Sequence, residues 1–129
     1  MDNFGIEKSW LMWEIGAGNI SAVQKNINGG MDVNFRYNHI TPLGEAAARG
    51  FDNIVTLLLD AGAKINAKCG DDSTALYRAV AFAPRLDTAE LLIRRGARRL
   101  TDTEYAEAMA WRDSREKDAA KFNKEVIYE

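Results

Sequence analysis

The middle of the chain carries apolar residues at the three- and four-residue spacing of an amphipathic helix. The residues on this face are Leu43, Ala46 and Ala47. Thr41 can cap the amino end, and Pro42 suits the first helical position, where its missing N–H is not needed. Gly50 suits the carboxyl end, because glycine readily adopts the left-handed conformation of a C-cap. The pattern therefore predicts a short helix between 42 and 49.

A second and more apolar segment follows directly. Its aliphatic residues are Ile54, Val55, Leu57, Leu58 and Leu59. Such a run is too apolar to face water and predicts a buried helix, which Gly62 closes. The small alanines of the first helix are complementary in size to these large side chains. Neither helix can bury its apolar face alone, so we expect the pair to stack against copies of itself.

The same signals recur along the chain with a period of about 33 residues. Thr41-Pro42-Leu43 returns as Thr74-Ala75-Leu76, and the pattern Gly-x-x-x-Asn occurs at Gly30–Asn34 and again at Gly62–Asn66. A third copy of that pattern begins at Gly96-Ala97 but lacks the asparagine. The period predicts three units, over roughly 9–34, 35–67 and 68–100.

These residues resemble the ankyrin repeat, most closely in the middle copy over 41–50 and 57–66. The resemblance covers roughly residues 10 to 100. It implies an all-α solenoid of stacked helix–turn–helix units joined by short hairpin loops. Gly44 and Tyr77 depart from the family pattern, because each stands where the family usually has histidine. An extra residue around Ala83–Arg85 predicts a longer turn of different shape in the third copy.

The two ends of the repeat array are expected to act as caps. In the first copy, Trp10–Trp13 stands in place of Thr-Pro-Leu, and polar Lys25 and Asn26 replace two family leucines, as suits an outer face in water. At the other end, Thr101–Glu104 forms a capping box before an apolar face that includes Tyr105, Ala108, Met109 and Trp111. A second box at Asp113–Glu116 is expected to open a polar helix. We assign 101–129 to this C-terminal cap.

Composition and charge narrow the function classes. The chain has 129 residues, 17 Lys and Arg against 19 Asp and Glu, and a formal net charge of −2, which gives no general attraction to nucleic acid or anionic lipid. There is no secretory signal pattern, and no apolar stretch approaches the roughly 20 residues of a membrane helix. A single cysteine fits a reducing compartment. We expect one cytoplasmic domain over 1–129, without a membrane segment.

The residues suited to catalysis or metal binding are few. His39 and Cys69 are the only histidine and cysteine, and we expect both on exposed hairpin tips without a third orienting group. A Cys–His nucleophilic pair stays open as the enzyme alternative. No cluster has the spacing of a zinc site, and no glycine-rich segment completes a phosphate-binding loop. The adjacent carboxylates Asp71 and Asp72 fit a turn better than a calcium site. We therefore expect no enzyme activity, no metal and no cofactor.

The ankyrin resemblance implies a concave binding surface made of hairpin tips and the exposed face of the first helices. Carried over to this chain, it implicates Arg36, Tyr37, His39, Ala48, Arg49, Lys68, Cys69, Asp71, Ala81 and Phe82. Tyr, Phe and Arg are the types that dominate interface energetics. The alternative is that Phe35 and Tyr37 fold back on the neighbouring repeat.

Two further groups of residues have competing interpretations. Arg94, Arg95, Arg98 and Arg99 form a candidate basic patch for nucleic acid or an acidic partner. They also suit the carboxyl end of a helix, whose dipole favours positive charge. Trp10, Trp13 and Trp111 lie near the ends of the array. We expect these large rings to cover the terminal repeats.

The ankyrin resemblance implies a small stand-alone module that works by binding another protein. Because few residues lie outside the repeats, we favour a chain that occupies one partner over one that bridges two, and that inhibits or regulates this partner in the manner of an immunity or anti-defence inhibitor. We also expect a monomer. A scaffold or adaptor subunit, a nucleic-acid or acidic-partner binder acting through the arginine cluster, and self-association through the terminal tryptophans are the alternatives. Nucleic acid is the less favoured partner, given the net charge.

Overall fold

The computed structural model describes residues 4–115, which form seven helices and no strand. The helices are α1 (Phe4–Gly16), α2 (Ile20–Asn28), α3 (Pro42–Arg49), α4 (Asp52–Asp60), α5 (Ala75–Phe82), α6 (Asp87–Arg94) and α7 (Asp102–Arg115). This is the all-α solenoid that the periodicity and the resemblance predict. The expectations for 116–129, including the later part of the C-terminal cap, lie outside the described residues.

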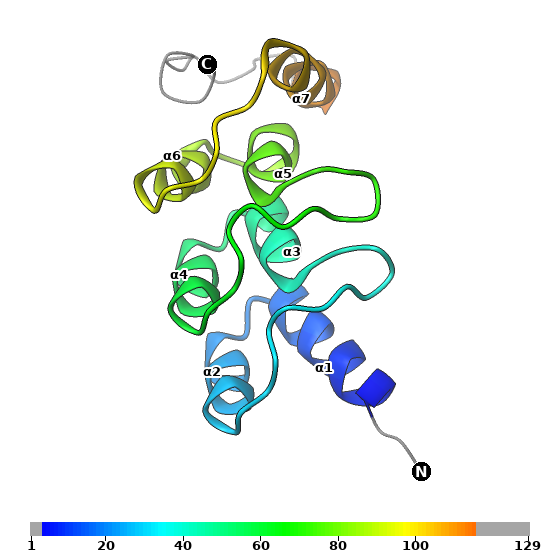
Figure 1. Ribbon diagram of the computed structural model, residues 1–129, viewed down its shortest axis with the longest axis vertical. Coiled ribbons are helices and arrows are strands. Elements are labelled where there is room, and N and C mark those ends of the chain that lie inside the picture. The colour runs from blue at the N-terminus through cyan, green and yellow to red at the C-terminus, as the bar shows by residue number, and fades with distance from the viewer. Residues whose placement is uncertain (1–3, 116–129) are drawn as a thin grey trace.

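The helices form two columns (Figure 1). The inner column holds α1, α3, α5 and α7, each packed on the next, and the outer column holds α2, α4 and α6. Two long hairpins, before α3 and before α5, project to the side of the inner column. The inner helices and the hairpins therefore share one side of the molecule, and this arrangement creates the face described below.

The inner helices begin and end where the sequence predicts. The Thr41 hydroxyl accepts a hydrogen bond from the Gly44 N–H at 2.9 Å, and the Thr74 hydroxyl does the same for the Tyr77 N–H at 3.2 Å. Gly50 ends α3 with a φ of 75°, the left-handed conformation that favours glycine. These caps satisfy backbone groups that would otherwise lack partners and so fix the length of each helix.

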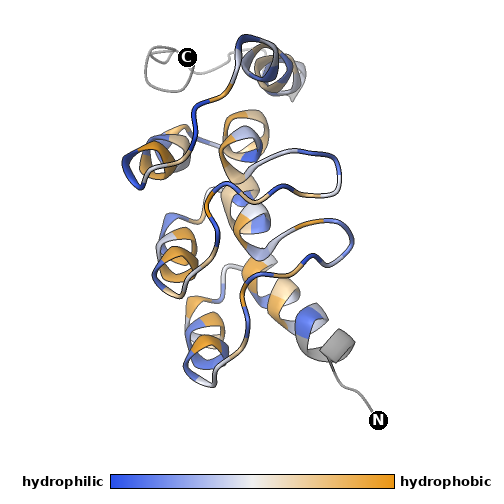
Figure 2. Cartoon of the chain, viewed as in Figure 1, coloured by the Kyte–Doolittle hydropathy of each residue, from blue (hydrophilic) through white to orange (hydrophobic). Residues whose placement is uncertain are grey.

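The core runs along the stack between the two columns (Figure 2). Ala46 and Ala47 of α3 are fully buried and allow the large side chains of α4 to approach closely. Val55 and Leu58 are likewise buried, whereas Leu57 and Leu59 are only half-buried, because they lie at the edges of the buried face of α4. The size complementarity of the paired helices is confirmed.

The recurring asparagines tie each repeat to the next. The Asn34 side chain donates to the Gly62 carbonyl and accepts from the Lys64 N–H, both at 2.9 Å. Asn66 accepts from the Arg98 N–H at 2.8 Å. These bonds explain the Gly-x-x-x-Asn pattern, because each asparagine satisfies backbone groups one repeat further along the chain. In the third copy Leu100 stands in place of the asparagine and is buried in the core.

The turn after α5 differs from its counterpart after α3, as the extra residue predicts. Ala83 ends α5 in an extended conformation, with φ −65° and ψ 146°, and no glycine cap follows. The fully buried Arg112 of α7 donates instead to the carbonyls of Val80, Ala83 and Pro84, at 2.9 to 3.2 Å. The last helix therefore supplies the missing C-cap of α5.

Three tryptophans do not cover the ends of the stack, and this prediction is wrong. Trp10, Trp13 and Trp111 are 58%, 64% and 54% exposed. The buried positions of α1 are Leu11 and Ile15, and those of α7 are Ala108 and Arg112. Because each pair has four-residue spacing, the intervening and flanking tryptophans point away from the core.

The second predicted capping box, which begins at Asp113, does not open a new helix. The first box is confirmed, since the Thr101 N–H donates to the Glu104 carboxylate at 2.9 Å and the Glu104 N–H donates to the Thr101 hydroxyl at 3.2 Å. Helix α7 then continues past Asp113 to Arg115 without a break. Asp113 is therefore a residue of the last turn that the structure describes.

Candidate functional site

The tip of the first hairpin is a tight turn. Tyr37 and Ile40 exchange backbone hydrogen bonds of 2.9 and 3.1 Å, and the turn between them places Asn38 at φ 51° and His39 at φ 68°. The Gly70 N–H of the second hairpin donates to the His39 carbonyl at 2.7 Å, so the two tips stack on each other.

The second tip is held by its own side chains. The Asp71 carboxylate accepts from the Ser73 N–H at 3.1 Å and from the Ser73 hydroxyl at 2.6 Å. The hydroxyl bond is the main reason that the pKa of Asp71 is lowered, and Arg78 lowers it further. Asp72 has a φ of 66°. Asp71 and Asp72 therefore serve the turn, which agrees with the structural interpretation of this pair.

Cys69 is not exposed on the tip, contrary to the sequence prediction. It is only 2% exposed, and its thiol lies 3.8 Å from the Thr41 hydroxyl. A methyl group at Gly44 would lie only 2.9 Å from Cys69 Sγ and 3.2 Å from Arg78 Cδ. Cys69 and Arg78 thus fill the space where the usual family residue would project from position 44. His39, in contrast, is exposed as predicted.

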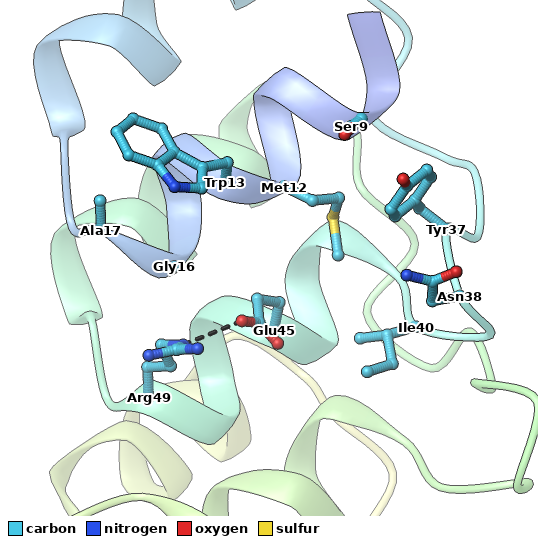
Figure 3. A pocket seen from close by; sticks show the side chains of 10 residues that line it. All are labelled: Ser9, Met12, Trp13, Gly16, Ala17, Tyr37, Asn38, Ile40, Glu45 and Arg49. Atoms are coloured by element: carbon cyan, nitrogen blue, oxygen red, sulfur yellow. Dashed lines mark hydrogen bonds and ion pairs between the residues drawn. The ribbon is translucent and has the colours of Figure 1, made fainter. Parts of the chain in front are cut away.

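We use the name inner face for the hairpin tips at 36–39 and 69–73 together with the exposed sides of α1, α3, α5 and α7. Its first depression, the N-terminal hollow, has a volume of about 520 Å³ and lies between α1, α3 and the first tip (Figure 3). It is lined by Ser9, Met12, Trp13, Gly16, Ala17, Tyr37, Asn38, Ile40, Glu45 and Arg49.

The N-terminal hollow combines exposed apolar surface with a fixed charge pair. Met12 and the ring of Trp13 border it from α1, and Tyr37 borders it from the hairpin (Figure 3). On α3 the Arg49 guanidinium lies 2.8 Å from the Glu45 carboxylate, one helical turn earlier. Aromatic, thioether and guanidinium groups in one concave place are typical of the centre of a protein interface.

The second depression, the acidic groove, has a volume of about 220 Å³ and lies between the second tip, α5 and α7. It is lined by Asp71, Asp72, Ser73, Tyr77, Phe82, Glu104, Glu107 and Trp111. The rings of Phe82 and Trp111 lie 6.0 Å apart at an angle of 53°. The pKa of Tyr77 is raised, first by burial and then by the negative charges of Glu107, Asp71 and Glu104.

The structure distributes the residues predicted for binding over different places. Tyr37 and Arg49 line the N-terminal hollow, whereas Asp71 and Phe82 line the acidic groove. Arg36 and Lys68 line a third depression together with Val33, Leu43 and Lys64. Arg36 therefore lines a different depression from its neighbour Tyr37, because successive residues of an extended segment face opposite sides.

The burial of three residues, Ala81, Ala48 and Phe35, bears on the predicted binding surface. Ala81 of α5 is fully buried and contributes nothing to the inner face, so its predicted role in binding is wrong. Ala48, its counterpart in α3, is half-buried. Phe35 folds back against the core, with the Lys8 ammonium 5.4 Å from the ring centroid, as the alternative interpretation proposed.

Several lining residues were not among those predicted to bind a partner. Trp13 and Met12 in the hollow, and Trp111 and Glu107 in the groove, come from α1 and α7. From the sequence, both tryptophans are expected to cover the terminal repeats. The position of a tryptophan near a terminus does not by itself show which face of its helix it occupies. Helical spacing from the buried Leu11 and Ala108 would have placed them outside the core.

The arginine cluster is partly neutralised by acidic residues of neighbouring elements. Arg95 lies 2.8 Å from Asp60 of α4, and Arg98 lies 3.4 Å from Glu104 of α7. Arg98 also donates to the carbonyl of Arg99 at 3.3 Å, while Arg94 is exposed in the last turn of α6. The cluster therefore links the third repeat to the elements on either side of it.

No group of three His, Cys, Asp or Glu side chains between residues 4 and 115 is arranged to hold a metal ion. None of the seven described helices is both long and apolar enough to cross a lipid bilayer.

Comparison with known proteins agrees with this architecture. The family model for ankyrin repeats in three copies matches residues 11–102, which is most of the chain. The chain belongs to the ankyrin-repeat family. Ankyrin repeats are a protein–protein interaction module. This ankyrin-repeat chain is also similar to the ankyrin repeat and KH domain-containing protein mask-1 of Caenorhabditis elegans, with 38% identity over 81 residues. That match covers 62% of this chain but 3% of the relative, so it relates the repeats alone.

Proposed function

We propose that this ankyrin-repeat chain binds one partner protein with its inner face and regulates the partner by occupying its surface. The observation that carries this proposal is the N-terminal hollow, where Trp13 is largely exposed beside Tyr37, Met12 and Arg49. Exposed aromatic residues on a rigid scaffold have no structural task there and suit an interface.

The inner face extends along the whole stack of inner helices. It runs from α1 to α7 along both hairpin tips, and a standard interface buries about 800 Å² on each partner. The tips are fixed by the Gly70–His39 hydrogen bond, so their ordering adds little entropy cost on binding. A rigid face of this kind fits an inhibitor or regulatory subunit, including one of the immunity or anti-defence type. We further propose that the chain is monomeric and works in the cytoplasm.

The proposal is tested by removing the aromatic rings of the hollow. The partner is first captured from the native cell and identified by mass spectrometry, and its affinity is then measured by calorimetry with the purified full chain. We expect the double substitution Trp13→Ala with Tyr37→Ala to weaken binding by about 2 kcal/mol or more, the size of an interface hot spot. The thermal midpoint should change little, because Trp13 is largely exposed and Tyr37 lies on a hairpin.

A control is available on the outer column of helices. Ile20, the first residue of α2, is 39% exposed and lines a separate depression with Phe51 and Asn53. Trp10 is not suitable, because its ring centroid lies 5.9 Å from that of Trp13. The substitution Ile20→Ala should leave the affinity for the partner unchanged. If Ile20→Ala weakens the complex and the hollow variant does not, the partner binds elsewhere and the proposal is wrong.

A further inference from the structure

The acidic groove offers an exposed aromatic platform at its C-terminal side. Trp111 is 54% exposed although it contacts Phe82, whose ring lies 6.0 Å away. Helix α7 reaches this position because buried Ala108 and Arg112 hold it against α5. The rigid packing below Trp111 means that its indole is presented to solvent in a fixed place.

The chain itself places one guanidinium group beside this platform. The Arg78 guanidinium lies 5.3 Å from the centroid of the Phe82 ring, within the range of a cation–π contact. It also lies 3.8 Å from the Asp71 carboxylate. Arg78 is therefore held between an aromatic ring and a carboxylate, and this internal contact shows the kind of group that these side chains accept.

The remaining carboxylates of the groove leave it negative. Asp71 and Glu104 are paired with Arg78 and Arg98. Asp72 and Glu107 have no ion pair within the described part of the chain, although both line the groove. The raised pKa of Tyr77 agrees with this, because Glu107 is the largest electrostatic contribution to it.

We propose that the acidic groove binds an arginine side chain that an exposed segment of the partner protein presents. The inference rests on the proposed function and names the chemistry of one contact within it. A planar guanidinium can stack on the Trp111 indole while it donates hydrogen bonds to Glu107 and Asp72. A volume of about 220 Å³ suits one long side chain and is too small for a folded element.

An uncharged or acidic occupant fits the groove less well. An apolar side chain would remove Asp72 and Glu107 from water without offering them a partner, which is unfavourable. An acidic side chain would add a like charge beside them. A lysine ammonium would satisfy the charge but lacks the planar surface that stacks on indole.

The test uses a matched pair of short peptides and the full chain. One peptide carries a single arginine between leucine and glycine residues, and the other carries citrulline, which has nearly the same shape without the charge. Binding is followed by NMR through the indole N–H signals of the three tryptophans. Trp111 reports on the groove, and Trp10 and Trp13 at the opposite end of the stack serve as internal references.

We expect the arginine peptide to shift the Trp111 signal at millimolar concentration and to leave the Trp10 signal in place. The citrulline peptide should bind about tenfold more weakly, the loss expected for a partly desolvated cation between a ring and carboxylates. Glu107→Gln should cause a similar loss for the arginine peptide, whereas the exposed control Glu90→Gln should have no effect. Circular dichroism checks that both variants keep the fold.

The inference is overturned if the two peptides bind equally, if Glu107→Gln has no effect, or if no Trp111 shift occurs. Sedimentation of the free chain tests whether the arginine comes from a second copy of this chain. Arg94 is exposed in the last turn of α6 and is the candidate. A dimer that dissociates in the variant Arg94→Glu would assign the groove to a second copy instead of a partner. Partner binding that depends on Trp13 and Tyr37 but not on Glu107 would refute this inference alone. A partner complex whose affinity is unchanged by Glu107→Gln and by the double substitution of Trp13 and Tyr37 would refute the proposed function as well.

Discussion

Position 44 shows how a single residue is matched to its surroundings across two repeats. Gly44 lies in the first turn of α3, where the family usually has histidine, and Cys69 from the next hairpin packs against it. The Arg78 side chain also donates to the Gly44 carbonyl at 3.3 Å. The absence of a side chain at Gly44 thus permits the close approach of Cys69 and Arg78.

We predict that Gly44→Ala lowers the free energy of unfolding by about 1–3 kcal/mol, as overpacking of a buried site does. The added methyl group would lie 2.9 Å from Cys69 Sγ. The double variant Gly44→Ala with Cys69→Ala should recover part of the loss, because the sulfur is then gone. Urea denaturation of the two single variants and the double variant measures this coupling.

Gly29→Ala is the control for backbone effects. Gly29 has a negative φ of −77°, and a methyl group there would meet its nearest neighbour at 3.5 Å, an ordinary contact distance. Its effect on stability should be within about 0.5 kcal/mol, as for most surface changes. Equal effects of the alanine substitutions at Gly44 and Gly29 would contradict the close packing described here.

At the scale of elements, the sequence predicts where α7 begins but not how the helix is attached to α5. The capping box at Thr101–Glu104 is local in sequence, so its residues alone were enough to predict it. The contact of Arg112 with the end of α5 joins residues about 30 positions apart, and nothing in the local pattern distinguishes a buried arginine from a surface one. The extra residue near Pro84 was the only indication that this turn needed another partner.

We predict that Arg112→Met destabilises the chain by about 1–3 kcal/mol, the cost of leaving buried hydrogen-bonding groups unsatisfied. The carbonyls of Val80 and Ala83 would lose their side-chain donor. Amide hydrogen exchange should then become faster in α5 and α7 than in α2. The exposed Arg94→Met is the control, and a similar thermal midpoint for the two variants would contradict an anchoring role for Arg112.

The capping box also predicts a pH dependence of stability. Burial raises the pKa of Glu104, but hydrogen bonds from Thr101 and the charge of Arg98 outweigh burial, and the pKa is lowered from its ordinary value of 4.5. A group with a lowered pKa in the folded state binds a proton more readily when unfolded. Its contribution is therefore present above pH 4.5 and is lost as the pH falls through the lowered value.

Urea denaturation between pH 7 and about pH 3 measures this contribution. We expect Glu104→Gln to reduce the loss of stability on acidification, because the amide does not titrate. Glu90→Gln, on the exposed surface of α6, should leave the profile closer to that of the unchanged chain. A profile for Glu104→Gln identical to that of the unchanged chain would refute the assignment.

At the scale of the whole molecule, the sequence period predicts the fold well and the binding face only in part. Repeated signals such as Asn34 and Asn66 define the stacking, because each copy repeats the same local contacts. The sides of the helices that remain exposed depend on what packs over them. Trp13 and Trp111 could be placed only once the buried positions of their helices were known. Ala81 is fully buried although its counterpart Ala48 in α3 is half-buried, so the repeat pattern alone does not give its exposure.

The two depressions make the two ends of the inner face chemically different. The N-terminal hollow is aromatic with a neutral Glu45–Arg49 pair, and the acidic groove near α7 carries carboxylates in excess. A partner that contacts both would bind in one orientation along the stack, with apolar side chains near α1 and a positive charge near α7. Charge arrangement of this kind contributes more to orientation and specificity than to affinity alone.

Hydrogen exchange of the chain, free and in complex with its captured partner, tests the central claim most directly. If the inner face binds, amides of the hairpin tips at 36–39 and 69–73 and of α3 and α5 exchange more slowly in the complex. Amides of the outer helices α2, α4 and α6 should be unchanged. Protection confined to the outer helices, with no change at either hairpin tip, would contradict the account.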